Sequence, residues 1–276
     1  PALGGVVANP MQEGQASKVF MFGLADYCWN TADFDASTNW NASFGFLFKD
    51  DAELAEAFKT FCINSESTNE PSELTSLYSS FKYSYYDFNL PTSTTNSIIS
   101  KMDEINAACA KIATMKNSNN DAYALMYKDI SPWSEKLASM TFIISSALKW
   151  MQSPGTVDNW TDYTGAIQHY NKLHSDPAFK SYVLEGAGTG TSVHYVEANP
   201  SDTYMEPFVD FVMGKYGVYA PEFSSQERNP EIIHNLSYLP SSVTLSTSNT
   251  ELSLGGLSNI SLAPGECIGI FINDIK

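Results

Sequence analysis

The strongest constraint on the fold is a run of amphipathic segments between residues 50 and 180. Over residues 92–116, apolar side chains recur at spacings of four, three, four and three residues, at Ile98, Met102, Ile105, Cys109 and Ile112. This repeat places all five side chains on one face of a helix. Helical periodicity also covers 51–64, 72–86, 120–152 and 157–173. Because the breaks between these segments are short and polar, we predict an antiparallel helical bundle.

Individual residues indicate where these helices begin or bend. Asp50 and Asp51 precede the first segment of the bundle, where an acidic side chain can cap a helix and complement its dipole. Ser37 or Thr38 is placed to cap an earlier helix in the same way. Pro132 lies inside the longest segment, where a proline either begins a new helix or kinks an existing one.

The last part of the chain changes from helical to strand periodicity. Residues 241–276 contain short runs that alternate apolar and polar side chains, which predicts β-strands. Three prolines among polar residues, Pro221, Pro230 and Pro240, indicate a linker over 218–240. The sequence therefore predicts a mainly α chain, with a helical bundle domain over 50–217 and a small β-rich segment after the linker.

The amino-terminal stretch has a different pattern. A short apolar run that begins at Gly4 stops at Asn9-Pro10, and residues 15–30 then carry apolar side chains at helical spacing. A buried parallel strand that leads into its crossover helix has this pattern. Asn9 would then lie at the carboxyl end of the strand, where barrels and open α/β sheets place ligand-binding groups. The alternative is that Asn9 only shapes the turn before Pro10.

Several motifs around Asn9 resemble those of a known enzyme family. They are Ala8-Asn9-Pro10-Met11, Ala16-Ser17-Lys18, Ala25-Asp26-Tyr27-Cys28-Trp29-Asn30, Ser37-Thr38-Asn39-Trp40 and Ala57-Phe58-Lys59-Thr60-Phe61. Together they resemble the end of the catalytic barrel in glycoside hydrolase family 84. These are bacterial β-N-acetylglucosaminidases, also called hyaluronidases, and they are related to the enzyme that removes O-linked N-acetylglucosamine from proteins. The resemblance is dense over residues 1–65 and looser over the helical region that follows.

This resemblance implies that residues 1–49 are the last strand and helix of a (β/α)8 barrel. In the family, the acetamido oxygen of the sugar attacks the anomeric carbon, and two neighbouring aspartates orient it and protonate the leaving group, unlike the usual two-carboxylate scheme. Those aspartates lie upstream of the Asn-Pro-Met motif. We therefore expect that this chain starts within a longer enzyme, contains no catalytic residue and is inactive alone. Asn9 would contribute its amide to sugar hydroxyls.

The resemblance also suggests an identity for the β-rich tail. Residues 261–275 resemble an early hairpin of the discoidin-like sugar-binding modules that often follow this family. Such a module needs about 130–150 residues, more than 241–276 supply. Either the module is truncated, or its strands pack on the helices as a small subdomain.

Charge and composition restrict the partners. The chain carries 31 acidic and 15 basic residues, for a net charge of −16. Nucleic acids and anionic membrane surfaces attract clustered Lys and Arg, so we expect neither as a partner, and neutral glycans that contain N-acetylglucosamine suit this charge better. No stretch approaches the roughly 18 apolar residues of a membrane-spanning helix. By resemblance, the protein would be secreted by a bacterium or held at its surface.

No metal, cofactor or redox motif is visible in the sequence. The four cysteines are widely spaced without a Cys-x-x-Cys pair, and we expect Cys28, Cys62 and Cys109 to act as small core residues. His169 and His174 lie five residues apart, off a common helical face, which argues against a metal site. The glycine-rich run 185–191 lacks the Gly-Lys-Ser/Thr ending of a phosphate loop and is interpreted as a flexible connector.

Two functional hypotheses follow from these observations. In the first, the chain is the carboxyl-terminal, non-catalytic part of a β-N-acetylglucosaminidase. In the second, it is a freestanding helical scaffold whose aromatic residues bind a glycan or a protein. A longer polypeptide with an adjacent pair of aspartates upstream of Pro1 would favour the first.

Overall fold

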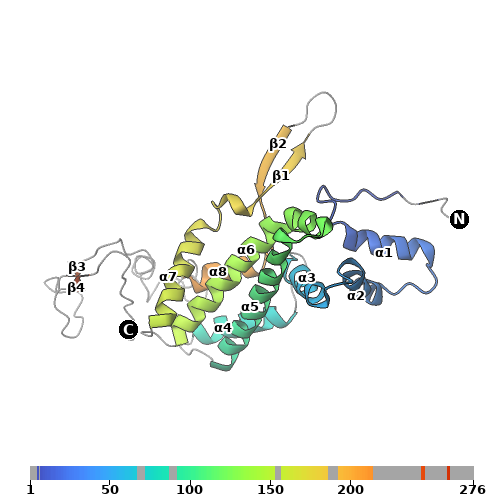
Figure 1. Ribbon diagram of the computed structural model, residues 1–276. Coiled ribbons are helices and arrows are strands. Elements are labelled where there is room, and N and C mark those ends of the chain that lie inside the picture. Colours follow the sequence, from blue (N-terminus) through green and yellow to red (C-terminus); the bar gives the residue numbers. More distant parts are fainter. Residues whose placement is uncertain are drawn as a thin grey trace. The chain divides into compact units, whose positions relative to one another are not determined.

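The fold is described from a computed structural model. It describes residues 5, 7–66, 72–86, 92–152, 157–185, 192–213, 244–245 and 260–261. The chain divides into two compact units, residues 1–209 and 210–276, which are treated separately. The first unit contains nearly all of the described elements, and they are predominantly helical (Figure 1). The prediction of a mainly α chain is therefore confirmed.

The centre of the first unit is formed by long helices. Helices α3 (Ala52–Ser65), α4 (Ser72–Tyr86), α5 (Thr92–Ala113), α6 (Asp121–Gln152) and α7 (Val157–Lys172) follow one another along the chain. Along the chain, the short 3-10 helix η1 (Thr114–Asn117) connects α5 to α6. In space, α5 and α6 lie side by side (Figure 1). The predicted helical segments are confirmed with small shifts at their ends.

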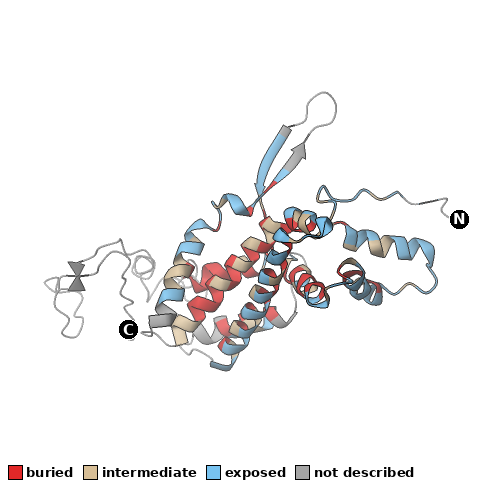
Figure 2. Ribbon diagram, viewed as in Figure 1, coloured by how far each residue is buried: buried red, intermediate tan, exposed pale blue. Residues whose placement is uncertain are grey.

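The core runs along the facing sides of α5 and α6. All five side chains of the predicted stripe on α5 are buried, and four of them are completely inaccessible to solvent. The facing positions of α6 include Leu137, Met140, Ile143 and Ile144, also fully buried. Figure 2 shows this buried band at the centre of the bundle. α6 continues through Pro132 as one helix, so this proline begins no new helix.

A β-hairpin was not foreseen in the first unit. After the short 3-10 helix η2 (Pro177–Phe179), strands β1 (Lys180–Glu185) and β2 (Ser192–Glu197) pair antiparallel, with Tyr182 opposite Tyr195. The glycine-rich run interpreted as a connector therefore links two strands, and residues 186–191 lie outside the described part of the chain. Helix α8 (Met205–Val212) follows the hairpin.

The predicted amino-terminal strand is wrong for the residues that are described. Residues 7–10 adopt no strand, and Val7 is 98% exposed. A strand needs a neighbour to pair with, and the only sheet described in this unit is the hairpin β1–β2. The predicted crossover helix does form, as α1 (Lys18–Trp29).

The predicted caps and cysteines are only partly correct. Asp51 caps α3 by accepting a hydrogen bond from the backbone N–H of Leu54, as expected. Helix α2 (Ala36–Leu47) is capped by Asp35 and not by Ser37 or Thr38, because the Asp35 carboxylate accepts from the Thr38 N–H at 2.7 Å.

Free cysteines are found at positions 28, 62 and 109; the first is exposed, the second half-buried and only the third buried in the core.

The second unit contains one short strand pair among its described residues. β3 (Thr244–Leu245) pairs antiparallel with β4 (Ile260–Ser261), which agrees with the strand periodicity of the tail. The predicted linker 218–240 and the rest of the predicted β-rich segment lie outside the described residues. None of the described helices is both long and apolar enough to cross a membrane.

Candidate functional site

Helix α1 is apolar, yet none of its residues is buried. Its sequence is KVFMFGLADYCW, and Phe20, Tyr27 and Trp29 expose 59%, 47% and 92% of their surface. On the neighbouring α2, Phe46 is 67% exposed and lies 5.2 Å, centroid to centroid, from Phe22. Figure 2 shows that α1 has no buried residue, in contrast to the buried band at the centre of the bundle. Adjacent exposed aromatic residues of this kind mark interaction surfaces.

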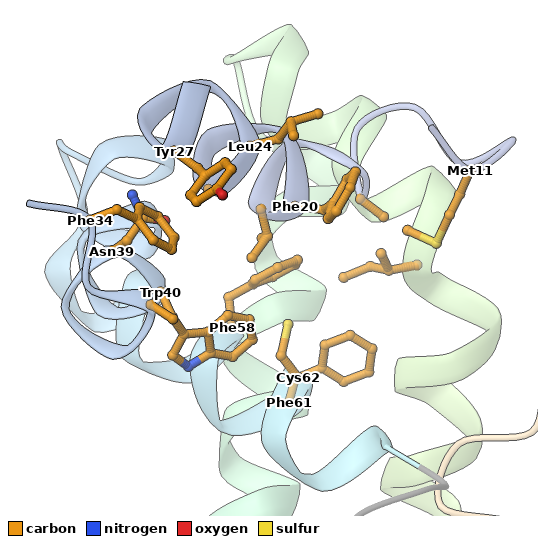
Figure 3. Close-up of a pocket in the computed structure, with 15 residues that line it drawn as sticks. Met11, Phe20, Leu24, Tyr27, Phe34, Asn39, Trp40, Phe58, Phe61 and Cys62 are labelled. Atoms are coloured by element: carbon orange, nitrogen blue, oxygen red, sulfur yellow. The ribbon is translucent and has the colours of Figure 1, made fainter. Parts of the chain in front are cut away.

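A pocket of about 660 Å³ opens between α1, α2, α3 and α6 (Figure 3). Phe20 and Leu24 approach it from α1, Trp40 from α2, and Phe58 and Cys62 from α3. Its other lining residues are Met11, Ala16, Val19, Gly23, Tyr27, Phe34, Ala36, Asn39, Phe61 and Ile130. The lining is therefore almost entirely apolar.

The pocket has no acid–base chemistry of its own. None of the described residues that line it carries a carboxyl group. The Asn39 amide is used within the protein, because its Nδ2 donates to Asp26 at 2.9 Å. Burial raises the pKa of the Cys62 thiol to about 12, so this sulfur is protonated at neutral pH and is not an activated nucleophile. The pocket can hold apolar groups but cannot hydrolyse a glycosidic bond as the usual carboxylate pair does.

Asn9, the predicted substrate-binding residue, lies on the exposed segment before α1. Three residues further on, the segment becomes attached to the bundle. The side-chain Nε2 of Gln12 donates to the backbone oxygen of Tyr182 on β1 at 2.7 Å, and the backbone N–H of Gln15 donates to Asp129 on α6, also at 2.7 Å. Asn9 is the one residue that the sequence predicts to bind substrate, and this role stays a prediction.

A charged cluster lies elsewhere in the same unit, around Lys136 of α6. The side chain of Lys136 is completely buried, and its ammonium group donates to Glu197 at the end of β2 and, at 3.1 Å, to Glu206 of α8. His174 lies 2.9 Å from Glu197 and 3.6 Å from Glu206. Burial acts to raise the pKa of Glu197, but hydrogen bonds from Lys136 and His174 outweigh it and hold this pKa below its ordinary value.

His174, Glu197 and Glu206 are close enough together to hold a metal ion. However, the buried Lys136 ammonium already faces both carboxylates and compensates their charge. The cluster is therefore better explained as an ion-pair network that joins α6, the hairpin and α8. Sequence patterns do not reveal it, because the glutamates follow His174 by 23 and 32 residues. His169, in contrast, makes an interhelical contact, with Nδ1 2.9 Å from the Ser139 hydroxyl.

Comparison with known proteins relates this chain to glycosidases. Residues 1–63 match the family model for beta-N-acetylglucosaminidase. These residues include Asn9, α1, α2 and most of α3. The resemblance to glycoside hydrolase family 84 is confirmed. Comparison with curated proteins finds no match.

Solved structures that share the fold include these three. CpGH84D is 23% identical, with a TM-score of 0.58, over 75% of this chain and 34% of its own. CpGH84B is 16% identical, with a TM-score of 0.54, over 74% of this chain and 32% of its own. A mutant of the O-GlcNAc hydrolase of Thermobaculum terrenum is 13% identical, with a TM-score of 0.51, over 81% of this chain and 44% of its own. The chain thus spans less than half of the length of each of these structures.

Proposed function

We propose that this chain is the carboxyl-terminal, non-catalytic part of a secreted bacterial β-N-acetylglucosaminidase of the family 84 type. In the intact enzyme, terminal or O-linked N-acetylglucosamine would be hydrolysed by the substrate-assisted, retaining mechanism. The aspartates for that reaction would come from a barrel upstream of this chain. The chain itself would support that barrel and contribute Asn9 to substrate binding.

One observation carries this proposal: α1, which none of the described contacts buries, and the exposed aromatic residue Phe46 of α2 both lie within the stretch that matches the glycosidase family. The match covers residues 1–63, and the apolar pocket is lined mainly by the same stretch. Burying apolar surface contributes about 25 cal/mol per Å², so an exposed aromatic helix gains much from a covering partner. The pocket lining offers no acid or base, so a supporting role suits it better than a catalytic one. A catalytic barrel that packs over α1 and α2 would supply the cover.

The competing hypothesis is a freestanding helical module that binds a glycan or a protein. The exposed aromatic residues of α1 and α2 agree with it, since aromatic rings are frequent at binding surfaces. The two hypotheses differ in what covers these helices. A barrel of the same polypeptide covers them in the first, and a separate ligand covers them in the second.

The first test is the activity of the chain alone. We expect no hydrolysis of an aryl β-N-acetylglucosaminide above background, because removing the general acid and the group that orients the acetamide costs several powers of ten in rate. Turnover that is abolished by mutating a residue of this chain would contradict the proposal.

The second test concerns Asn9 in the longer enzyme. Replacing Asn9 by Ala would leave sugar hydroxyls without partners, at a cost of about 1–3 kcal/mol. The expected result is a loss of about tenfold to a hundredfold in kcat/KM. If Asn9 only shapes the turn before Pro10, the melting temperature would fall and the kinetics would stay unchanged. Asn9→Asp, measured beside Asn9→Ala, separates loss of the amide donor from loss of the side chain.

A further inference from the structure

We propose that the helical bundle fixes the position of the segment that carries Asn9, and that Asp129 of α6 is the positioning residue. This inference rests on the proposed function, because it assigns the bundle a part in substrate binding that goes beyond mechanical support. The contacts that carry it join residues 12–17, which follow Asn9 in the chain and are called the segment below, to helix α6 and strand β1.

The segment is attached at three points to residues that are distant in the sequence. Asp129 Oδ2 accepts the Gln15 N–H at 2.7 Å across 114 residues, and the Tyr182 backbone oxygen accepts from Gln12 at 2.7 Å across 170 residues. The Ser181 hydroxyl donates to the Glu13 carboxylate at 3.4 Å. Hydrogen bonds to a charged acceptor are stronger than neutral ones, so the contact with Asp129 is the principal attachment.

The segment is also folded internally, so an attachment at one residue places its neighbours. The Ser17 N–H and the Ser17 hydroxyl both donate to the Glu13 backbone oxygen, at 3.0 Å each, and Ser17 is only 1% exposed. α1 starts at the next residue. A turn held in this way transmits the position of Gln15 to α1 on one side and to the residues that follow Asn9 on the other.

The hairpin that makes the other two contacts with the segment is itself attached to α6. Lys136 lies seven residues after Asp129, about two helical turns along α6, and therefore on the same face. Its ammonium pairs with Glu197, and Glu197 lies opposite Lys180 in the hairpin register. Lys180 directly precedes the two residues of β1 that contact the segment. One face of α6 thus contacts the segment directly through Asp129. Through Lys136, the same face also contacts the hairpin that is hydrogen-bonded to the segment.

Asp129 offers clean variants. Asp129→Asn keeps a side-chain oxygen that can accept from Gln15, whereas Asp129→Ala removes the acceptor altogether. Lys128, the adjacent and exposed residue of the same helix, provides a matched control, since Lys128→Ala removes a side chain without touching the segment. Neither position belongs to the predicted substrate contacts.

The first measurement is amide hydrogen exchange of residues 12–17 in this chain. Asp129→Ala should speed exchange of the Gln15 amide at least tenfold, since a hydrogen bond to a carboxylate is lost. Asp129→Asn should give intermediate protection, and Lys128→Ala should change nothing. Unchanged exchange in Asp129→Ala would overturn the inference whatever the activity of the longer enzyme.

The second measurement is the kinetics of the longer enzyme on an aryl β-N-acetylglucosaminide. Misplacing a binding group lowers the rate even when the mutated residue does not touch the substrate, so Asp129→Ala should lose about tenfold in kcat/KM. Asp129→Asn should restore most of it, and Lys128→Ala should match the wild type. An equal loss in Lys128→Ala, or normal kinetics in Asp129→Ala, would contradict a positioning role. A longer enzyme that is inactive without any mutation would instead refute the proposed function.

Discussion

Two helix pairs of the same unit both carry large apolar side chains and use them differently. In α5 and α6, the apolar stripe of each helix faces the other, and residues such as Ile105 and Leu137 are inaccessible to solvent. In α1 and α2, aromatic residues such as Phe20, Trp29 and Phe46 remain exposed. The apolar stripes of the first pair are buried against each other, whereas part of the apolar surface of the second pair is exposed to solvent.

This difference separates stability from function. Since burial of apolar surface stabilises the fold, the α5–α6 pair accounts for much of the stability of the bundle. The exposed surface of α1 and α2 contributes little to the stability of this chain, and it coincides with the residues that match the glycosidase family. Mutations in the two regions should therefore have different consequences.

The largest effect on stability is expected at Lys136, in the buried half of this comparison. Lys136→Ala leaves two carboxylates facing each other without their counter-charge, which should lower the free energy of unfolding by about 3–4 kcal/mol. Urea unfolding would measure this. Lys111→Ala is the control, because Lys111 pairs with Asp51 and Glu53 at the surface and its loss should matter far less. Equal effects in the two variants would contradict the importance assigned to the buried network.

The next effect compares the two helix pairs directly. Ile105→Ala opens a cavity in a fully buried site and should cost about 3 kcal/mol. Phe20→Ala removes a larger side chain, but from an exposed site, and should change the free energy of unfolding of this chain by about 0.5 kcal/mol or less. If Phe20→Ala destabilised the chain as much as Ile105→Ala, α1 would be part of the core and would need no external partner.

The smallest effect is the pH dependence of the charged network. The pKa of Glu197 is lower in the folded chain than its ordinary value of 4.5, so the unfolded chain binds this proton first as the pH falls. The stability that Glu197 contributes is present above its unfolded pKa and is lost as the pH falls through the folded pKa. Between neutral and acidic pH, the free energy of unfolding should therefore fall less steeply for Glu197→Gln than for the wild type. Identical slopes would show that Glu197 is not the linked group.

The parts of the fold that local periodicity determines were predictable from the sequence. The stripe on α5 repeats within one helix, and the Asp51 cap depends on residues three positions apart. The hairpin β1–β2 and the network around Lys136 were missed because each depends on partners that are distant in the sequence. The apolar run that ends at Asn9 was predicted as a strand, but residues 7–9 form none, because a strand also requires a neighbour that a local pattern cannot supply.

For the candidate site, the resemblance to a glycosidase family was visible in the sequence, whereas the exposed apolar surface of α1 and α2 was visible only in the structure. The motifs around Asn9 indicated a glycosidase, and the match over residues 1–63 agrees with them. The apolar spacing of residues 15–30 predicted α1 correctly, but Cys28, which was expected in the core, is exposed. The contacts of Gln12 and Gln15 could not be predicted, because each has a backbone group as one partner, and the residue type does not indicate which backbone group will be used.

The most direct test of the proposed function is hydrolysis of an aryl β-N-acetylglucosaminide by this chain co-expressed with the upstream barrel. We expect activity only when both pieces are present, because the proposed barrel would supply the aspartates and would pack over the exposed apolar side chains of α1 and α2. Phe20→Asp should abolish or strongly reduce that activity while the bundle stays folded, since it places a charge on the covered surface. Activity of this chain alone, or full activity of the pair that carries Phe20→Asp, would contradict the proposed function.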